Sequence, residues 1–360
     1  MAAAFRIIDT GIREGRENIA FDAALIEARQ SNRIPDTIRF LRFPPTALIG
    51  RHQDLSREVD LDYCRQHGIG TVRRITGGGA IYLDEGQLGW ELVFHRSSLG
   101  IAALPDLARE ICTAAARGLS ALGVEARFRP RNDIEVDGRK ISGTGGFFDG
   151  DILIYQGTVL VDMNPQQMVR ALKIPESKLA KRNLDSAAQR VTTLQALLND
   201  RLPGLDAIKE CLVNGFAEGL GISAAPGTVS EDEVALARKY YNEEIGTDEF
   251  VAEIDNPAGT SGVIAGSHTG AGGTIDAYLK LQGPSCRILQ RLLISGDFFV
   301  TPPRVVFDLE AHLQGSRLED IDAAIDDFFA VNEIDMLSVT ADDFKASISN
   351  ALCGRGDKHV

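Results

Sequence analysis

Residues 73–82 read Arg-Arg-Ile-Thr-Gly-Gly-Gly-Ala-Ile-Tyr, and this stretch decides how the rest of the chain is interpreted. Three consecutive glycines let the backbone come close to a ligand, and their N–H groups can point at an anion. Arg73 and Arg74, directly before them, could pair with a phosphate or a carboxylate. The alternative is a flexible turn with two solvated arginines. Strand-like sequence on both sides favours the binding loop.

The sequence around this loop predicts a mixture of helices and strands. Residues 17–30 space their apolar side chains at three and four positions, as an amphipathic helix does. Residues 37–43 alternate and stop at Pro44-Pro45, which predicts a strand and a turn. We expect further strands at 47–50, 71–75, 80–83, 88–95, 124–128, 132–137, 139–147 and 151–162. We expect further helices at 58–67, 104–122, 165–172, 192–199 and 203–219.

A second candidate segment, residues 131–143, reads Arg-Asn-Asp-Ile-Glu-Val-Asp-Gly-Arg-Lys-Ile-Ser-Gly. Asp137-Gly138 predicts a tight hairpin turn, from which Lys140 leads into an apolar strand. Lys140 could be a solvated hairpin residue, or it could place a positive charge over a transferring carboxyl and phosphate. Asp133 could hold Mg²⁺ together with phosphates, since hard carboxylate oxygens suit that ion. The residues alone leave these alternatives open.

Length and composition indicate a globular protein of about two domains. Of the 360 residues, 44% are hydrophobic, which excludes a disordered chain. A small, polar, proline-containing stretch at 222–230 suggests a boundary, and the uncharged, glycine-rich residues 256–275 predict an exposed loop. The net charge of −13 does not favour duplex DNA or an anionic membrane as a partner.

The chain shows no sign of a membrane span, a secretory signal or a metal motif. It has no run of about 18 apolar residues, and its N-terminus turns charged too soon for a signal peptide. The five cysteines form no CxxC pair and the six histidines no HExxH pattern, so we expect neither a disulfide framework nor a tightly bound metal. These features predict a soluble, cytoplasmic protein, and an enzyme is the favoured class.

Taken together, these segments resemble the biotin/lipoate protein ligase superfamily, and its lipoate–protein ligase branch most closely. The matching catalytic segments are Ala-Leu-Ile-Gly-Arg-His-Gln at 47–53, the block at 73–80, Asn-Asp at 132–133, Gly-Arg-Lys-Ile-Ser-Gly at 138–143 and Tyr-Gln-Gly-Thr at 155–158. Lys-Leu-Ala at 178–180 and Gln-Arg-Val-Thr-Thr-Leu at 189–194 look like the family's adenylate-covering loop and following helix. Gly-Thr-Ile at 273–275, Ser-Gly-Asp-Phe-Phe at 295–299 and Leu-Gln-Gly at 313–315 are similar to its accessory domain.

The resemblance implies an α+β fold, with a mixed β-sheet flanked by helices in a catalytic domain (1–225) and a small α+β accessory domain (230–360). It implies a two-step reaction in which lipoate or octanoate and ATP form an acyl-adenylate, and a lysine of a lipoyl-carrier domain then takes the acyl group and releases AMP. ATP and lipoate are substrates in this reaction, and Mg²⁺ accompanies ATP. The acceptor would be a dehydrogenase E2 subunit, a glycine cleavage H-like protein or another lipoyl protein.

The resemblance also assigns roles to residues. Lys140, the catalytic residue, would bridge the lipoate carbonyl and the α-phosphate, while Asn132 and Asp133 would orient ATP and Mg²⁺, with Asp133 as the metal ligand. The residues expected to bind ATP or lipoate are Arg74, Thr76, Gly77, Gly78, Gly79, Ala80, Ile81, Tyr82, Asn132, Asp133, Ser142, Gly143, Gly157, Thr158 and Arg190. Gly157 and Thr158 would line the acyl pocket. Candidate contacts to the acceptor are Arg51, Arg131 and Arg182.

The chain departs from the family pattern at two places near the acyl tunnel. Leu83 stands where relatives often have a histidine before the aspartate, and Tyr155-Gln156 stands where many ligases have two histidines. Both changes bear on which acyl group is accepted, and the reaction type does not depend on them.

Three other functions remain open. An octanoyl- or lipoyl-transferase of the same fold uses a cysteine thiolate instead of ATP, but residues 124–133 hold no cysteine where such enzymes carry one, and Cys112 fits a helix core. Biotin ligases usually carry a Gly-Arg-Gly-Arg segment that is not present here. A non-catalytic lipoyl-binding or scaffold protein would not need Arg74, the triple glycine and Lys140 together, and consumption of ATP separates it from a ligase.

Overall fold

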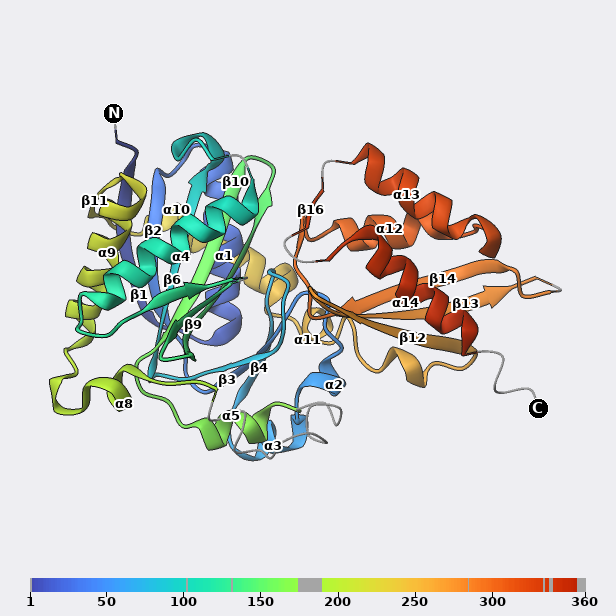
Figure 1. Ribbon diagram of the computed structural model, residues 1–360, viewed down its shortest axis with the longest axis horizontal. Helices are drawn as coiled ribbons and strands as arrows, with labels where there is room; N and C mark the ends of the chain where they lie inside the picture. Colours follow the sequence, from blue (N-terminus) through green and yellow to red (C-terminus); the bar gives the residue numbers. More distant parts are fainter. Residues whose placement is uncertain are drawn as a thin grey trace. The chain divides into compact units, whose positions relative to one another are not determined.

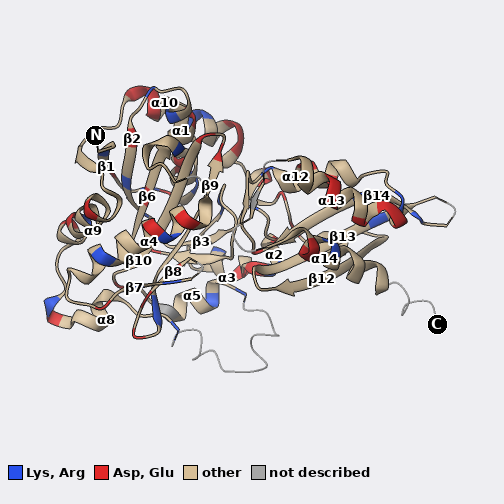
Figure 2. Ribbon diagram, turned by 45° about the horizontal axis from the view of Figure 1, so that its top comes forward, with Lys and Arg blue, Asp and Glu red and all other residues tan. Residues whose placement is uncertain are grey.

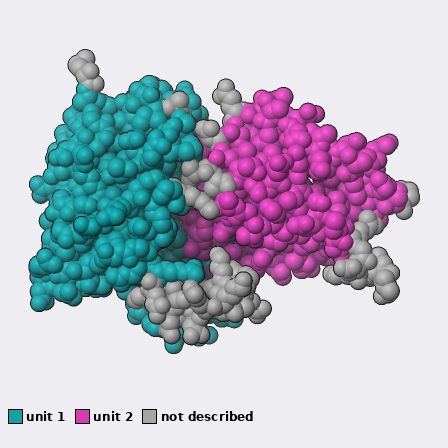
Figure 3. Space-filling view, viewed as in Figure 1, with its two compact units in different colours: residues 1–48, 59–73, 81–251 teal, residues 49–58, 74–80, 252–360 magenta. Residues whose placement is uncertain are grey.

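The computed structural model describes residues 2–101, 103–130, 132–173, 190–283, 285–332, 334–336 and 339–354. The chain forms two compact units (Figure 3). Unit 1 comprises Met1–Leu48, Val59–Arg73 and Ile81–Val251, and unit 2 comprises Ile49–Glu58, Arg74–Ala80 and Ala252–Val360. Residues 230–251 therefore pack with unit 1, and the division into domains at 225–230 stays a prediction.

Unit 1 is built on a mixed sheet of eight strands in the order β11-β1-β2-β6-β10-β9-β8-β7 (Figure 1). Strands β11, β1 and β2 run parallel to one another, and each later pair from β2–β6 to β8–β7 is antiparallel. The strands are β1 (Ala4–Ile12), β2 (Asp36–Arg42), β6 (Gln87–His95), β7 (Arg127–Arg129), β8 (Asp133–Val136), β9 (Arg139–Asp149), β10 (Ile152–Leu160) and β11 (Ser223–Pro226).

Helices cover both faces of this sheet, α1 (Gly15–Gln30) with α10 (Glu231–Tyr240) on one and α4 (Leu104–Ser120) with α9 (Leu205–Leu220) on the other (Figure 1). Successive residues of a strand face opposite sides of the sheet, and two neighbouring residues of β6 illustrate this. The buried Trp90 ring packs against Phe216 of α9 at 5.1 Å, while its neighbour Glu91 lies on the α1 face. The predicted α+β fold, a mixed sheet flanked by helices, is confirmed.

A smaller sheet of three strands, in the order β4-β3-β5, and several short helices complete this part of the chain. The strands are β3 (Thr46–Ile49), β4 (Gly70–Arg73) and β5 (Ile81–Leu83). The short helices of unit 1 are α3 (Leu61–Gln66), η1 (Arg96–Ser98), α5 (Pro165–Ala171), α8 (Leu194–Leu198), η2 (Asn199–Arg201), η3 (Tyr241–Ile245) and α11 (Asp248–Val251), while α2 (Leu55–Glu58) belongs to unit 2. Within the described ranges, no helix is long and apolar enough to cross a membrane.

Unit 2 carries a three-stranded antiparallel sheet, β12-β13-β14, packed against helices. Buried apolar residues from the sheet and the helices, such as Leu279, Leu309 and Phe344, form one core. The elements are η4 (Pro257–Gly259), β12 (Val263–Gly270), β13 (Gly273–Gln282), β14 (Ile288–Gly296), β15 (Val300–Thr301), α12 (Val305–Leu313), η5 (Leu318–Asp320), α13 (Ile321–Val331), β16 (Asp335–Met336) and α14 (Ala341–Cys353).

The prediction of an exposed loop over 256–275 is wrong, because most of that stretch is strand β12 and the start of β13. Its glycines serve close packing. A Cβ on Gly266 would lie 2.0 Å from the backbone nitrogen of Ala351 in α14, so only glycine lets the helix backbone approach the strand this closely.

A buried charge cluster joins the α1 face of the main sheet to the helix. Arg39 of β2 donates hydrogen bonds to Asp22 at 2.7 Å, to Glu91 at 2.9 Å and to Asn18 at 2.7 Å. The Gln156 amide donates to the second oxygens of both carboxylates, at 2.7 and 2.8 Å. Burial, and then the Glu91 charge, raise the pKa of Asp22 well above its ordinary value. Among the described residues, Arg39 is therefore the cation that forms ion pairs with both buried acids.

Replacing Arg39 with leucine should destabilise the fold strongly, because two buried carboxyl groups would lose their counter-charge. We expect Arg39→Leu to lower the free energy of unfolding by about 3–5 kcal/mol, measured by urea denaturation. Arg33→Leu is the matched control, since Arg33 forms an exposed pair with Glu27 and should cost at most about 0.5 kcal/mol. Equal costs for the two variants would contradict the interpretation.

Candidate active site

A β-bulge in β9 sets the direction of the Lys140 side chain. Along the β8–β9 pair, Ile134 faces Ser142 but the next residue, Glu135, faces Lys140, which leaves Ile141 without a partner. Residues three apart in a regular strand point to opposite faces, and one extra residue reverses that phase. A Cβ on Gly143 would accordingly lie 2.6 Å from Lys140 Nζ.

The bulge brings Lys140 to the face that Asp133 occupies, because Asp133 stands directly opposite Gly143. Lys140 Nζ lies 2.8 Å from Asp133 Oδ1, and Arg129 Nη2 lies 2.5 Å from Asp133 Oδ2. Burial alone would raise the pKa of Asp133, but Lys140 and then Arg129 outweigh it and hold this pKa below its ordinary value. The site is thus a carboxylate held between two cations.

The backbone of Lys140 is held by a segment from much later in the chain. Lys140 N–H donates to the Arg190 carbonyl at 2.8 Å, and Thr192 N–H donates to the Lys140 carbonyl at 2.9 Å. Residues 190–192 therefore form a parallel bridge with Lys140. Arg190, predicted to bind a ligand, contributes its carbonyl here while its side chain is exposed.

Asn132 is fixed by reciprocal bonds with Thr144 of β9. Asn132 Nδ2 donates to the Thr144 carbonyl at 2.6 Å, and Thr144 N–H donates to the Asn132 carbonyl at 2.8 Å. Beneath them, Thr144 Oγ1, Cys112 Sγ and Tyr155 Oη form a buried triangle with separations of 2.8 to 3.3 Å. Asn132 thus braces the strand that carries Lys140.

The predicted Mg²⁺ ligand Asp133 has no ready-made set of further metal ligands among the described residues. Both of its oxygens already face cations, and among the residues that the structure describes no three His, Cys, Asp or Glu side chains gather into a metal-holding group. A Mg²⁺ ion at Asp133 would therefore have to displace a cation and take its other ligands from phosphate or water. The metal role of Asp133 stays a prediction.

Arg74 is a buried cation without a carboxylate partner in the described ranges. Its Nη2 donates to the Gly77 carbonyl at 2.7 Å and to the Gly79 carbonyl at 2.8 Å, so the guanidinium ties the glycine loop together. Its Nη1 is buried and makes no hydrogen bond. Burial lowers the pKa of Arg74 to about 10, which shows the cost of holding this charge without an anion. The orphaned Nη1 fits an anionic ligand.

The triple-glycine loop is packed tightly within unit 2, to which residues 74–80 belong. Gly78 N–H donates to the Phe298 carbonyl at 2.9 Å, and a Cβ on Gly78 would lie 2.3 Å from the Phe299 ring. On the other side, a Cβ on Gly50 would lie 1.9 Å from the Gly78 carbonyl oxygen. Thr76 is buried and accepts from Arg51 N–H at 2.9 Å through its carbonyl. The close packing of this loop therefore requires glycine, whether or not the loop also binds a ligand.

The two arginines before the glycines have different roles. Arg73 is fully buried in unit 1, where its Nε donates to the Phe250 carbonyl at 3.1 Å and its Nη2 donates to the Val251 carbonyl at 2.9 Å. These carbonyls lie at the end of α11, so Arg73 stabilises a helix terminus. Arg74 is the arginine of this pair that keeps an unused donor.

The remaining predicted residues lie on strands. Ile81 and Tyr82 belong to β5, and Tyr82 Oη donates to Gln167 of α5 at 2.9 Å. Gly157 and Thr158 belong to β10, and a Cβ on Gly157 would lie 2.2 Å from the Trp90 ring, so glycine is required there.

The structure places the predicted residues in both units. Asn132, Asp133, Lys140, Ser142, Gly143 and Arg190 gather around the β8–β9 hairpin of unit 1, while Arg74 to Ala80 belong to unit 2. Arg51, a candidate acceptor contact, forms an ion pair with Glu253 and lies over the Phe307 ring. Arg131, Arg182, the 178–180 segment and Gln189 lie outside the described residues.

Sequence reasoning missed two features near these residues. The hydroxyl groups of Thr192 and Ser142 are buried and make no hydrogen bond. Ser142 was among the residues predicted to bind ATP or lipoate, and Thr192 was not. The contact of Phe298 and Phe299 with the glycine loop was missed as well. The Ser-Gly-Asp-Phe-Phe block was the available signal, since two consecutive aromatics after a glycine suggest a packed turn.

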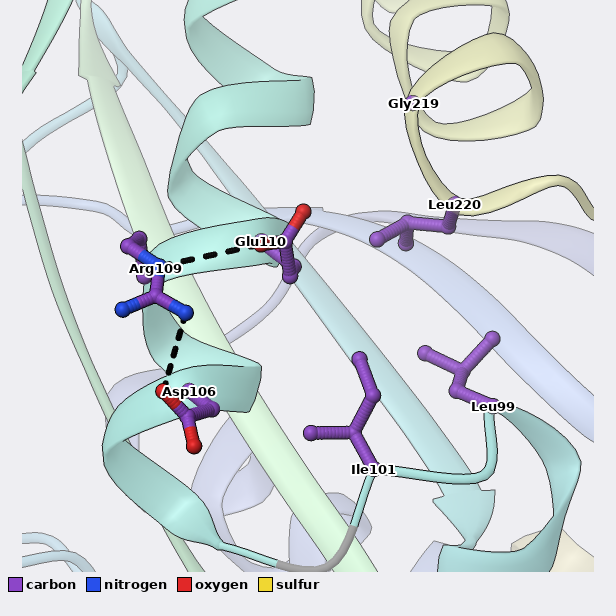
Figure 4. Close-up of a pocket in the computed structure, with 7 residues that line it drawn as sticks. All are labelled: Leu99, Ile101, Asp106, Arg109, Glu110, Gly219 and Leu220. Carbon is purple, nitrogen blue, oxygen red and sulfur yellow. Dashed lines mark ion pairs between the residues drawn. The ribbon is translucent and has the colours of Figure 1, made fainter.

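A separate pocket of about 350 Å³ lies between the start of α4 and the end of α9 (Figure 4). Its apolar wall comes from Leu99, Ile101 and Leu220. Arg109 there pairs with Asp106 at 2.9 Å and with Glu110 at 3.7 Å. None of the predicted site residues lines it.

Residues 14–217 match the family model for the lipoyl protein ligase A/B catalytic domain, and the chain belongs to this family. Two relatives with assigned activities show what the family contains. Octanoyltransferase LipM of Symbiobacterium thermophilum is 30% identical over 273 residues, covering 69% of this chain and 98% of that protein. Lipoate-protein ligase A subunit 1 of Thermoplasma acidophilum is 29% identical over 245 residues, covering 65% and 91%.

Solved structures show the same fold. A bipartite lipoate protein ligase with its E2 lipoyl domain from Thermoplasma acidophilum superposes with a TM-score of 0.62 at 27% identity, covering 70% of this chain and 97% of that chain. A lipoate-protein ligase A bound with ATP gives 0.62 at 26% identity, covering 71% and 100%. LipL1 of P. falciparum in complex with lipoate gives 0.70 at 15% identity, covering 92% and 95%, a likeness of fold.

The packing of the glycine loop predicts that two neighbouring glycines differ in tolerance. Gly78 has a φ of +89° and faces the Phe299 ring, whereas the Gly79 Cβ position is 3.8 Å from its nearest neighbour. Gly78→Ala should lower the free energy of unfolding by about 1–3 kcal/mol from backbone strain alone, and Gly79→Ala by at most about 0.5 kcal/mol, in urea denaturation.

Phe299→Ala separates the two causes of the Gly78 effect. In that background Gly78→Ala should cost less than in the wild-type chain but still more than Gly79→Ala, because the strained φ remains. A Gly78→Ala variant as stable as Gly79→Ala would contradict the packing.

Proposed function

We propose that this protein is an ATP-dependent lipoate–protein ligase, which activates lipoate or octanoate to the acyl-adenylate and transfers the acyl group to a lysine of a lipoyl-carrier domain. The observation that carries the proposal is the placement of Lys140, whose backbone is bridged to residues 190–192 and whose side chain the bulge turns towards Asp133. A positioned cation of this kind can stabilise negative charge that develops on a transferring group.

The proposed reaction has two steps. A carboxylate oxygen of lipoate bonds to the α-phosphorus of ATP while the bond to the pyrophosphate oxygen breaks. The amine of the acceptor lysine then attacks the acyl carbon, the bond to AMP breaks, and the amine loses a proton. Lys140 would stabilise charge on the acyl carbonyl and the α-phosphate, and the buried Arg74 Nη1 supports an anion contact at the glycine loop.

The burial of Cys64 and Cys112 argues against either of them as the nucleophile of a thiol-dependent transferase. A transferase needs a thiolate, which forms readily when the thiol is partly exposed and near a cation. Cys112 is fully buried, and burial raises the pKa of its thiol. Burial likewise raises the pKa of Cys64 to about 11. Both thiols are therefore protonated at neutral pH.

The length of the matches does not separate the two activities. The octanoyltransferase relative covers 69% of this chain and the lipoate-protein ligase subunit covers 65%. The rest of this chain has a counterpart of the same fold in LipL1, which aligns over 92% of it.

Ligands and partners follow from the same proposal. A relative of this fold was solved with ATP and another with lipoate, and a third with its E2 lipoyl domain, which supports ATP, lipoate and a lipoyl domain as the ligands here. Mg²⁺ would arrive with ATP, since the described residues hold no group of three His, Cys, Asp or Glu side chains that could bind it. We place the reaction in the cytoplasm, where ATP is available.

Removing the Lys140 charge should suppress the first step. We expect Lys140→Ala to lower lipoate-dependent ATP–pyrophosphate exchange by about 10²–10³-fold, with an unchanged circular dichroism spectrum. Lys239→Ala, an exposed lysine on α10, is the matched control and should exchange at the wild-type rate. Exchange at the wild-type rate by Lys140→Ala would refute the role of Lys140.

Replacing Cys112 should leave the reaction intact. We expect Cys112→Ala to acylate a lipoyl domain with ATP and lipoate at close to the wild-type rate, since its thiol is protonated and bonded to Thr144 and Tyr155. Mass spectrometry of the protein incubated with an octanoylated donor should show no acyl adduct on Cys112. An adduct there, together with loss of transfer in Cys112→Ala, would favour the octanoyltransferase that the matched relative represents.

A further inference from the structure

Unit 2 contains a second pocket, of about 540 Å³. It lies on the face of the β12–β14 sheet that points away from the core helices. Its polar lining consists of Tyr278, Lys280, Gln290, Arg291 and Gln314, with the carboxylates of Glu253 and Asp255. Pockets of 300–1,000 Å³ are the usual size for small ligands. Every lining residue belongs to unit 2.

Two cations stand directly opposite each other in this pocket. Lys280 of β13 is the cross-strand partner of Arg291 of β14, and both side chains are exposed. The register shifts immediately beyond this pair, because Gln290 is an extra residue in β14. Like charges at directly opposite positions destabilise a sheet. The arrangement therefore costs stability unless an anion lies between the two side chains.

The other Lys and Arg side chains of residues 252–354 form ion pairs. Residues 252–354 contain six Lys and Arg side chains, and acidic positions outnumber basic ones on α12, α13 and α14 (Figure 2). Four of the six form ion pairs: Arg287, Arg304, Arg317 and Lys345. Lys280 and Arg291 form none with the described residues. Within residues 252–354, the two Lys and Arg side chains without an ion pair are thus opposite each other in one pocket.

Two carboxylates, Glu253 and Asp255, also line the pocket, and both have partners other than Lys280 and Arg291. Glu253 forms an ion pair with Arg51, and Asp255 accepts a hydrogen bond from Ser56 N–H at 3.1 Å. Glu310, the buried acid within electrostatic range of Arg291, accepts from Ile294 N–H at 2.6 Å. Burial raises the pKa of Glu310 to about 7, so much of it is neutral at physiological pH. None of these groups neutralises Lys280.

We propose that this pocket binds a small oxyanion, a phosphate ester or a polycarboxylate, through Lys280, Arg291 and the amides of Gln290 and Gln314. The guanidinium can take two anion oxygens at once, the ammonium adds a third donor, and the amides add neutral donors. The site uses none of the residues assigned to acyl transfer, and its existence does not depend on the ligase reaction.

Binding of inorganic pyrophosphate and of citrate to the full-length protein tests the proposal, by isothermal titration at constant ionic strength. At least one of the two should bind. Lys280→Gln/Arg291→Gln should weaken that binding by at least about tenfold, since both charged hydrogen-bond donors are removed. Preference for pyrophosphate over citrate, or the reverse, identifies the phosphate or the carboxylate as the natural group.

Arg287→Gln/Arg304→Gln is the matched control, because it removes the same charge from the same unit at paired positions. It should bind the anion as the wild type does. Without ligand, Lys280→Gln should melt at a higher temperature than the wild type, since the repulsion is removed. Absence of binding by the wild type, equal weakening in both double variants, or a lower melting temperature for Lys280→Gln would each overturn the proposal.

Discussion

The placement of Lys140 depends on one extra residue in strand β9. Because Ile141 faces no residue of β8, the alternation of side chains reverses at this point and Lys140 shares a face with Asp133. The bridge to residues 190–192 then holds the backbone of Lys140, and Asn132 braces the same strand through Thr144. Without the bulge the ammonium group would point to the opposite face of the sheet, away from Asp133.

Local signals in the sequence predicted the elements that carry this site. Asp137 and Gly138 have φ values of +50° and +75°, as the expected tight hairpin turn requires, and helix α4 and strand β10 lie within a few residues of their predicted ranges. The bulge could not be predicted, because it depends on the register between two strands. Arg73 and Arg74 look equivalent in sequence for a related reason: only the fold shows that one stabilises a helix end.

Two further features of unit 2 could not be predicted from the sequence: the strand formed by a glycine-rich segment, and the placement of Lys280 opposite Arg291. Residues 263–270 look like a loop because they are small and uncharged, yet α14 needs that smallness to pack on β12. Lys280 and Arg291 are eleven residues apart, and only the antiparallel register places them opposite each other. In both cases the decisive partner is distant in sequence, so no local pattern could show it.

The central claim is that ATP drives the transfer of the acyl group to a lipoyl-domain lysine, with Lys140 stabilising the developing negative charge and no thiol intermediate. The most direct test is the intact mass of a lipoyl-domain acceptor after incubation with this protein and lipoate, with and without ATP and Mg²⁺. We predict a gain of one lipoyl group that requires ATP and is accompanied by release of AMP. A gain from an acylated donor protein in the absence of ATP, with none from lipoate and ATP, would contradict the claim and identify a transferase.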